Sequence, residues 1–214
     1  MDFVLNSNIP YYRYFEEMTR IPHGSFHEQP YSDYLVAWAK GHGLRHLQDE
    51  MGNVVIYKPA SAGYEDRPAV LLQAHTDMVC VCDPGQNHDF RTDPLELYIE
   101  DGWLRAKGTT LGADDGVGCA YMLAILEDDT LPHPPLECVF TVQEEVGCNG
   151  AAHLKAEYFT AKRMIGLDDV GGGTSYVTTA GSQIVEFRRS VAWEQGTRSG
   201  YRLTLSGLKS GHSG

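Results

Sequence analysis

Residues 69–79 read Ala-Val-Leu-Leu-Gln-Ala-His-Thr-Asp-Met-Val, an apolar run that leads into His75 and Asp77. The run is too short for a helix and is rich in Val and Leu, which predicts a buried strand. In open α/β sheets, ligand sites gather just beyond the carboxyl ends of the strands, where both polar side chains stand. This stretch therefore predicts the fold class and the sheet edge on which a site would lie.

Similar apolar runs recur along the chain, and helical stretches lie between them. The alternation indicates an α/β fold in which helices flank a mostly parallel central sheet. Strands are predicted at 54–57, 69–73, 136–142 and 164–167, helices at 117–126 and 151–158, and a hairpin at 95–99 and 103–106.

Two further helices are predicted near the start of the chain. Pro10 is typical of a first helical turn and predicts a helix that ends near Arg20. Ser25 and Glu28 have the spacing of a capping box, and they precede an apolar stripe that stops at Gly41. We expect both helices to be structural.

Carboxylates follow the later strands too. Glu144 and Glu145 follow Gln143 after the third predicted strand, and Asp168 follows the fourth, while Asp114 and Asp115 lie in a glycine-rich loop before a helix. Each acid alone has an ordinary interpretation as a helix cap or a loop residue. Together with a histidine at one sheet edge, they would repel one another unless cations neutralised them. The pattern therefore predicts a metal centre.

The residue types also indicate which metal and which chemistry. Imidazole with carboxylates suits Zn²⁺, with Mn²⁺ or Co²⁺ as substitutes, and one carboxylate can bridge two ions. His75 can bind metal through one ring nitrogen while the Asp77 carboxylate accepts a hydrogen bond from the other. Glu145 can bind metal while Glu144 takes a proton from water as a general base. Metal-assisted hydrolysis is the reaction class that follows.

Composition excludes several classes of partner. The 214 residues carry 29 Asp and Glu against 17 Lys and Arg, a formal net charge of −12 that would repel nucleic acid and anionic membranes. No basic start with an apolar run opens the chain, and no 18 apolar residues follow one another. Five cysteines form an odd number without a C-x-x-C pair. We expect a soluble, cytoplasmic protein.

Five strings of the sequence resemble those of a known family, the dinuclear zinc peptidases that include carboxypeptidase G, aminoacylase and the carnosinase-like dipeptidases. Within that family, Ile21-Pro22-His23 and Gly-Thr-Thr-Leu-Gly-Ala-Asp are most similar to the Xaa-His dipeptidases. The resemblance implies hydrolysis of Xaa-His dipeptides by a zinc-activated water. The strings are QAHTDMV at 73–79, GTTLGADDGVG at 108–118, TVQEEVG at 141–147, GLDD at 166–169 and GLKSGHSG at 207–214.

The resemblance also implies a ligand set. His75, Asp114 and Asp168 would hold one zinc, and Asp114 would bridge to a second zinc held by Glu145. The family's second site also needs a histidine from a later part of a longer chain, so we expect that site to be incomplete here.

Further roles carry over in the same way. Glu144 would be the catalytic base, Asp77 would orient His75, and His212 of a lid domain would stabilise the oxyanion. The peptide bond between Asp114 and Asp115 would be cis.

The resemblance predicts two domains. Residues 1–182 would form a zinc-peptidase catalytic domain without its C-terminal part, and residues 183–214 would begin a smaller α+β lid with strands at 184–191 and 201–206. The full-length protein would be a homodimer that acts on a small dipeptide, and the 214-residue chain itself would be inactive. Two alternatives stay open: an N-acyl-amino-acid deacylase or another di- or tripeptidase of the family, and a non-catalytic metal-binding fragment.

Overall fold

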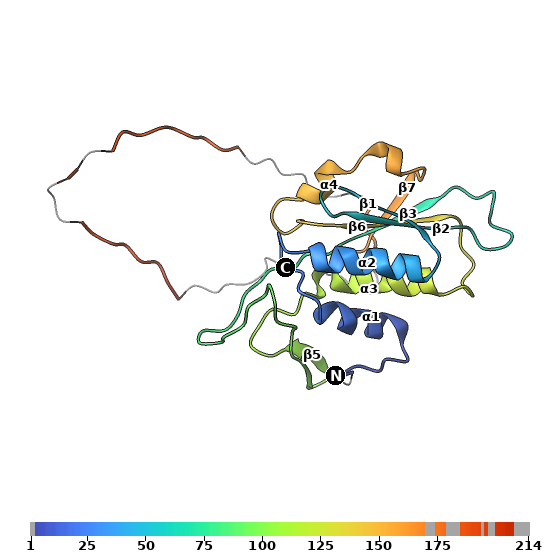
Figure 1. Ribbon diagram of the computed structural model, residues 1–214, viewed down its shortest axis with the longest axis horizontal. Helices are drawn as coiled ribbons and strands as arrows, with labels where there is room; N and C mark the ends of the chain where they lie inside the picture. The colour runs from blue at the N-terminus through green and yellow to red at the C-terminus, as the bar shows by residue number, and fades with distance from the viewer. Residues whose placement is uncertain (1–2, 170–173, 179–184, 194, 197–199, 208–214) are drawn as a thin grey trace. The chain divides into compact units, whose positions relative to one another are not determined.

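The computed structural model describes residues 3–169, 174–178, 185–193, 195–196 and 200–207 (Figure 1). The chain divides into two units, Met1–Asp169 and Val170–Gly214. All of the helices and strands described below belong to the first unit.

A five-stranded sheet, in the order β1-β2-β6-β3-β7, forms the centre of the first unit. β6 (Leu136–Thr141), β3 (Val70–His75) and β7 (Arg163–Gly166) run parallel with β3 in the middle. β1 (Arg45–Gln48) and β2 (Val54–Lys58) join them through antiparallel pairs. The predicted α/β class is confirmed, and the parallel strands are the ones that precede the predicted site residues.

The register brings the ends of the parallel strands to one edge. His75 pairs with Thr141, and Gln73 pairs with Gly166. The residues that follow these strands therefore emerge side by side, as the sequence predicted.

Helices cover both faces of the sheet (Figure 1). α1 (Pro10–Thr19), α2 (Gln29–Gly41) and α3 (Ala113–Glu127) lie on one face, and α4 (Asn149–His153) and the short 3₁₀ helix η1 (Ala156–Tyr158) lie on the other. The strands β2, β3 and β6 at the centre of the sheet are mostly apolar and buried, since side chains pack on both of their faces. The main core, on the α1–α3 face, includes Phe15, Leu35, Ile56, Met122 and Phe140.

Two local predictions were wrong. The helix predicted at 151–158 is interrupted at Leu154, whose φ of −61° and ψ of 137° are extended. The capping box at Ser25 and Glu28 is not formed, since α2 begins at Gln29 without a side-chain cap. Both side chains instead form hydrogen bonds with residues far away in the sequence, and these bonds compete with capping of the helix.

The predicted hairpin is confirmed as β4 (Leu97–Glu100) and β5 (Trp103–Ala106), which pair antiparallel in a sheet of their own. Within the described residues, every helix is too short or too polar to cross a membrane.

In the second unit, residues 174–178, 185–193, 195–196 and 200–207 contain no helix or strand. The paired strands predicted at 184–191 and 201–206 are therefore not formed in the described residues. An alternating pattern favours an extended chain, but a β-sheet also needs a neighbouring strand that forms hydrogen bonds with the main-chain N–H and C=O groups. The predicted boundary at 182/183 and His212 lie outside the described residues.

Candidate metal centre

His75 ends β3 and is the centre of the site. Its side chain is 1% exposed, and Nδ1 donates a hydrogen bond to the main-chain oxygen of Asp77 at 2.9 Å. Because a carbonyl oxygen only accepts, this bond assigns the proton to Nδ1. Nε2 is then the nitrogen that would bind a metal, once the ring has given up its second proton.

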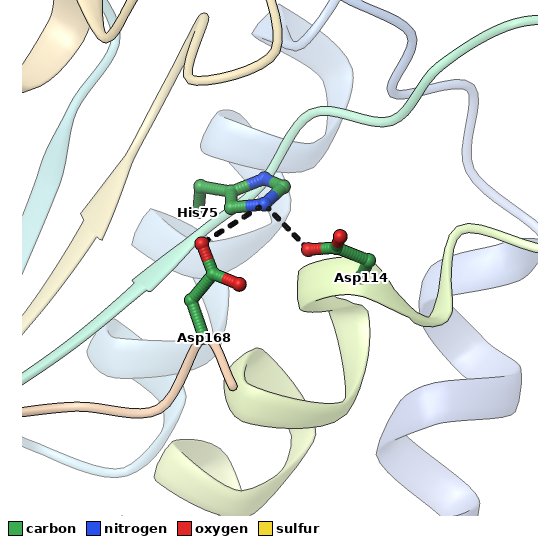
Figure 2. A group of neighbouring side chains, drawn as sticks. All are labelled: His75, Asp114 and Asp168. Atoms are coloured by element: carbon green, nitrogen blue, oxygen red, sulfur yellow. Dashed lines mark hydrogen bonds and ion pairs between the residues drawn. The ribbon is translucent and has the colours of Figure 1, made fainter. Parts of the chain in front are cut away.

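Two carboxylates face that nitrogen (Figure 2). Asp114 Oδ1 lies 3.0 Å and Asp168 Oδ2 lies 3.8 Å from His75 Nε2. Asp114 comes from the start of α3 and Asp168 from the residues after β7, so three separate segments converge. One ligand atom from each residue lies within 4.8 Å of the others.

The glutamates form a second group around the same histidine. Ligand atoms of His75, Glu144 and Glu145 also lie within 4.8 Å of one another, and Glu144 Oε2 is 3.9 Å from Nε2. All four predicted metal ligands and the predicted base are therefore brought together. One imidazole among hard carboxylate oxygens is a donor set that fits Zn²⁺, Mn²⁺ or Co²⁺.

The electrostatics of the site indicate an excess of negative charge. Burial lowers the pKa of His75, but the carboxylates of Asp77, Asp115 and Asp114 outweigh it and raise that pKa to about 10. Burial and the charge of Asp114 raise the pKa of Asp168. Such acids ionise reluctantly when no cation is near, and a divalent cation would remove the cost.

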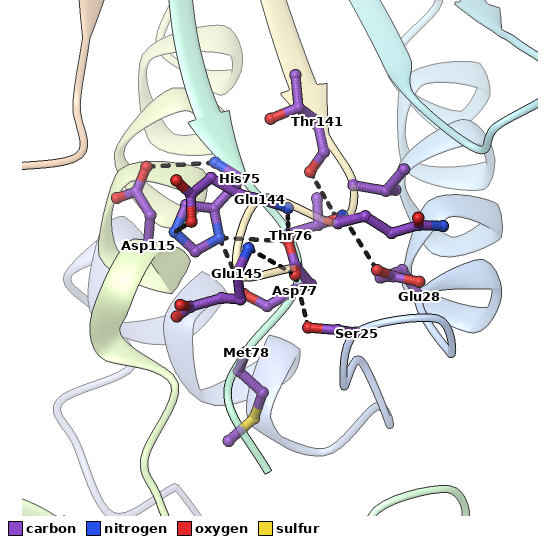
Figure 3. A network of polar contacts seen from close by, with 12 residues as sticks. Ser25, Glu28, His75, Thr76, Asp77, Met78, Asp115, Thr141, Glu144 and Glu145 are labelled. Carbon is purple, nitrogen blue, oxygen red and sulfur yellow. Dashed lines mark hydrogen bonds and ion pairs between the residues drawn. The ribbon is translucent and has the colours of Figure 1, made fainter. Parts of the chain in front are cut away.

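The Asp77 carboxylate has different partners from those that the sequence predicted. Its nearer oxygen is 3.5 Å from His75 Nδ1, while the main-chain oxygen of Asp77 takes the hydrogen bond. The carboxylate instead accepts hydrogen bonds from Ser25 Oγ at 2.7 Å, Glu144 N at 2.9 Å and Glu145 N at 3.2 Å (Figure 3). Burial opposes the charge, yet the nearby His75 ring and the hydrogen bonds from Ser25 and Glu144 hold the pKa of Asp77 below its usual value.

The peptide bond between Asp114 and Asp115 is cis, as the resemblance implied. Asp115 is 4% exposed and accepts hydrogen bonds from the main-chain N of His75 at 3.3 Å and of Gly118 at 3.1 Å. A Cβ on Gly118 would overlap the Asp115 carboxylate, so a larger residue there would force that carboxylate to move. Burial, opposed by the charge of His75 and aided by that of Asp168, raises the pKa of Asp115 to about 7.

Sequence reasoning assigned no role in the site to Asp115, Cys119, Ser25 or Glu28. Asp115 and Cys119 both bond to the main chain of His75, and their four-residue spacing on one helix face was the available signal. Ser25 and Glu28 carried no local signal beyond a helix cap, because their partners are 52 and 115 residues away.

The chain is similar to known proteins in both sequence and structure. Residues 71–206 match the model of Peptidase family M20/M25/M40. The cytosol non-specific dipeptidase of Escherichia coli is 41% identical over 209 residues, which cover 96% of this chain and 43% of that protein.

Two solved structures are also similar. The aminoacylhistidine dipeptidase of Vibrio alginolyticus has a TM-score of 0.75 at 40% identity, over 79% of this chain and 34% of that one. A tripeptidase of Staphylococcus aureus has a TM-score of 0.64 at 25% identity, over 78% and 45%. The chain thus spans less than half the length of each of these relatives.

Proposed function

The chain belongs to peptidase family M20/M25/M40, and from that premise we propose that it supplies the ligands and the general base of a dinuclear zinc dipeptidase. The observation that carries this proposal is the convergence of Asp114 and Asp168 on Nε2 of His75, at 3.0 and 3.8 Å. The similar proteins whose names state an activity include two dipeptidases and a tripeptidase.

The residues divide into distinct roles. His75, Asp114 and Asp168 would hold one zinc, and Asp114 with Glu145 would hold a second. Bound zinc supplies Lewis acidity, which lowers the pKa of water and polarises the scissile carbonyl. Mn²⁺ or Co²⁺ suits the same donor set.

Glu144 is the proposed base. Its side chain is 33% exposed, so solvent and a substrate can reach it, and Oε2 lies 3.9 Å from His75 Nε2. The carboxylate takes a proton from the attacking water and later delivers it to the leaving amine. A base placed in this way contributes about 10² to 10⁴ in rate.

The proposed substrate is an Xaa-His dipeptide. Support comes from the similarity to the structure of the aminoacylhistidine dipeptidase of Vibrio alginolyticus, at 40% identity. The Escherichia coli relative is called a non-specific dipeptidase, so a broader dipeptide preference is the second candidate. The word cytosol in that relative's name supports a cytoplasmic location, and homodimer formation stays a prediction.

Metal titration together with a peptide panel tests the proposal. We expect the 214-residue chain to bind Zn²⁺ in calorimetry with a dissociation constant in the micromolar range or tighter, and the His75→Ala variant to lose this binding. We expect the natural gene product to hydrolyse Gly-His faster than Ala-Ala, and N-acetyl-alanine not at all. Failure to bind zinc would contradict the metal site, and preferred cleavage of N-acetyl-alanine would make the protein a deacylase.

A further inference from the structure

The segment between α1 and α2 is attached to the chain that leaves β3. Met78 N donates to His23 O at 3.2 Å, and Ser25 N donates to Met78 O at 3.4 Å, around a parallel bridge between Gly24 and Met78. A Cβ on Gly24 would overlap the sulfur of Cys80, so the two segments are in close contact. These main-chain hydrogen bonds therefore fix the position of the backbone that carries the side chains of residues 25–28.

Ser25 uses that position to hold the Asp77 carboxylate. Its Oγ donates to Oδ2 at 2.7 Å, and the same oxygen accepts from Glu145 N at 3.2 Å, while Oδ1 accepts from Glu144 N at 2.9 Å. The hydroxyl thus fixes the carboxylate to which two successive main-chain N–H groups are bound (Figure 3).

Glu28 holds the preceding residue of the same loop. Its side chain is buried at 5% exposure, and Oε1 accepts a hydrogen bond from Gln143 N at 3.1 Å. Gln143 has a φ of 54°, a left-handed conformation that is unfavourable for a residue with a side chain. β6 has ended at Thr141, so the N–H of Gln143 lies beyond the strand ladder, and the Glu28 carboxylate accepts its hydrogen bond.

Three successive N–H groups, those of residues 143, 144 and 145, are therefore bound by carboxylates from outside the loop. We infer that Ser25 and Glu28 are positioning residues that hold the main chain of 143–145 so that the side chains of Glu144 and Glu145 face His75. The roles of Glu144 as base and Glu145 as metal ligand rest on the proposed function. Ser25 and Glu28 lie outside residues 71–206, the part that the family model matches.

Paired variants test this inference. Ser25→Ala and Glu28→Ala remove the two contacts, while Ser25→Thr and Glu28→Gln retain a hydroxyl and an acceptor oxygen. Ser32→Ala and Glu16→Ala are matched controls, since Ser32 is a buried hydroxyl that donates to Gly52 O and Glu16 is a buried carboxylate that accepts from Val4 N and Leu5 N.

The first measurement needs neither metal nor substrate. In hydrogen-exchange NMR of the 214-residue chain, we expect the amides of 143–145 to exchange at least tenfold faster in Ser25→Ala and Glu28→Ala, and to recover in Ser25→Thr and Glu28→Gln. The two controls should lose stability without this local change. Unchanged exchange at 143–145, or an equal effect in the controls, would overturn the inference.

The second measurement concerns function. Titration with Zn²⁺ alone should give about tenfold weaker binding in each alanine variant, and the natural gene product carrying them should lose kcat at an unchanged KM. If the wild type binds no zinc, the proposed function fails while the exchange data still decide the positioning role. If the wild type binds zinc and the alanine variants bind it equally well, the positioning role fails and the proposed function stands.

Discussion

The Cys119 thiol donates a hydrogen bond to the main-chain oxygen of His75, with 3.1 Å between sulfur and oxygen. One helical turn earlier, Asp115 accepts a hydrogen bond from the main-chain N of the same histidine at 3.3 Å. The first turns of α3 therefore bind both main-chain polar groups of a proposed metal ligand. The helix that presents Asp114 also fixes the direction in which His75 points.

Cys119→Ala should weaken zinc binding by about tenfold, because the bond that orients His75 is lost. Cys138→Ala is the matched control, since both thiols are fully buried in the same core cluster. Each variant should lose about 1 to 2 kcal/mol in urea unfolding. Equal zinc affinity in calorimetry for the two variants would mean that the Cys119 contact is packing alone.

Glu144→Gln in the natural gene product should lower kcat by about 10² to 10⁴. The amide retains the shape of the side chain but cannot take a proton. Metal content should stay at the wild-type level, because Glu144 is not one of the proposed ligands. Steady-state kinetics and metal analysis check both points, and retained turnover would mean that another residue is the base.

Asp77→Asn should weaken zinc binding by about tenfold to a hundredfold and lower kcat. The new amide would turn a donor toward Ser25 Oγ, Glu144 N or Glu145 N, all of which donate to the carboxylate. The bond from His75 Nδ1 to the main-chain oxygen should survive. Nitrogen NMR of the His75 ring should show the same tautomer, and a changed tautomer would restore the direct role that the sequence predicted.

Gly150→Ala should destabilise the chain by about 3 kcal/mol through overpacking. A Cβ there would overlap the Val142 carbonyl oxygen and lie 2.5 Å from Oδ1 of the buried Asn53. Gly41→Ala is the control, because no atom lies within 4 Å of its added Cβ at the end of α2. The unfolding temperature should fall in Gly150→Ala and rise in Gly41→Ala, since alanine favours a helix over glycine by up to about 1 kcal/mol.

Tyr14 should make stability fall in alkali. Burial raises its pKa to about 12, so the folded chain keeps the proton that the unfolded chain releases near pH 10. This contribution is present below pH 10 and is lost between about pH 10 and 12, up to about 2 kcal/mol. Tyr14→Phe should make the fall in urea-unfolding stability over that range shallower, and Tyr98→Phe, at an exposed residue, should leave it unchanged.

The sequence predicted the site residues that lie at the end of a short apolar strand or within three residues of it. His75, Glu144 and Asp168 were found because a short apolar run announces the strand and parallel strands end at one edge. β1 was not predicted, since Arg45–Gln48 is polar and partly exposed and gives no apolar run.

Contacts between distant segments could not be read in this way. Ser25 and Glu28 fit a capping box by their spacing, but their hydrogen-bond partners are Asp77 and Gln143. A local sequence motif takes account only of residues that are close in the sequence, so it predicted that the two side chains cap the nearest helix. The choice between the carboxylate and the main-chain oxygen of Asp77 as partner of His75 likewise depends on how the turn bends after β3.

The sharing of the Asp77 carboxylate among Ser25, Glu144 and Glu145 has an energetic consequence. Free energies of substitution at these positions cannot add, because a serine that orients a carboxylate has nothing left to orient once that carboxylate is gone. The double mutant at 25 and 77 should therefore resemble the single mutant at 77. In evolutionary terms the two positions would be epistatic, because a change at 25 has little further effect once 77 has changed.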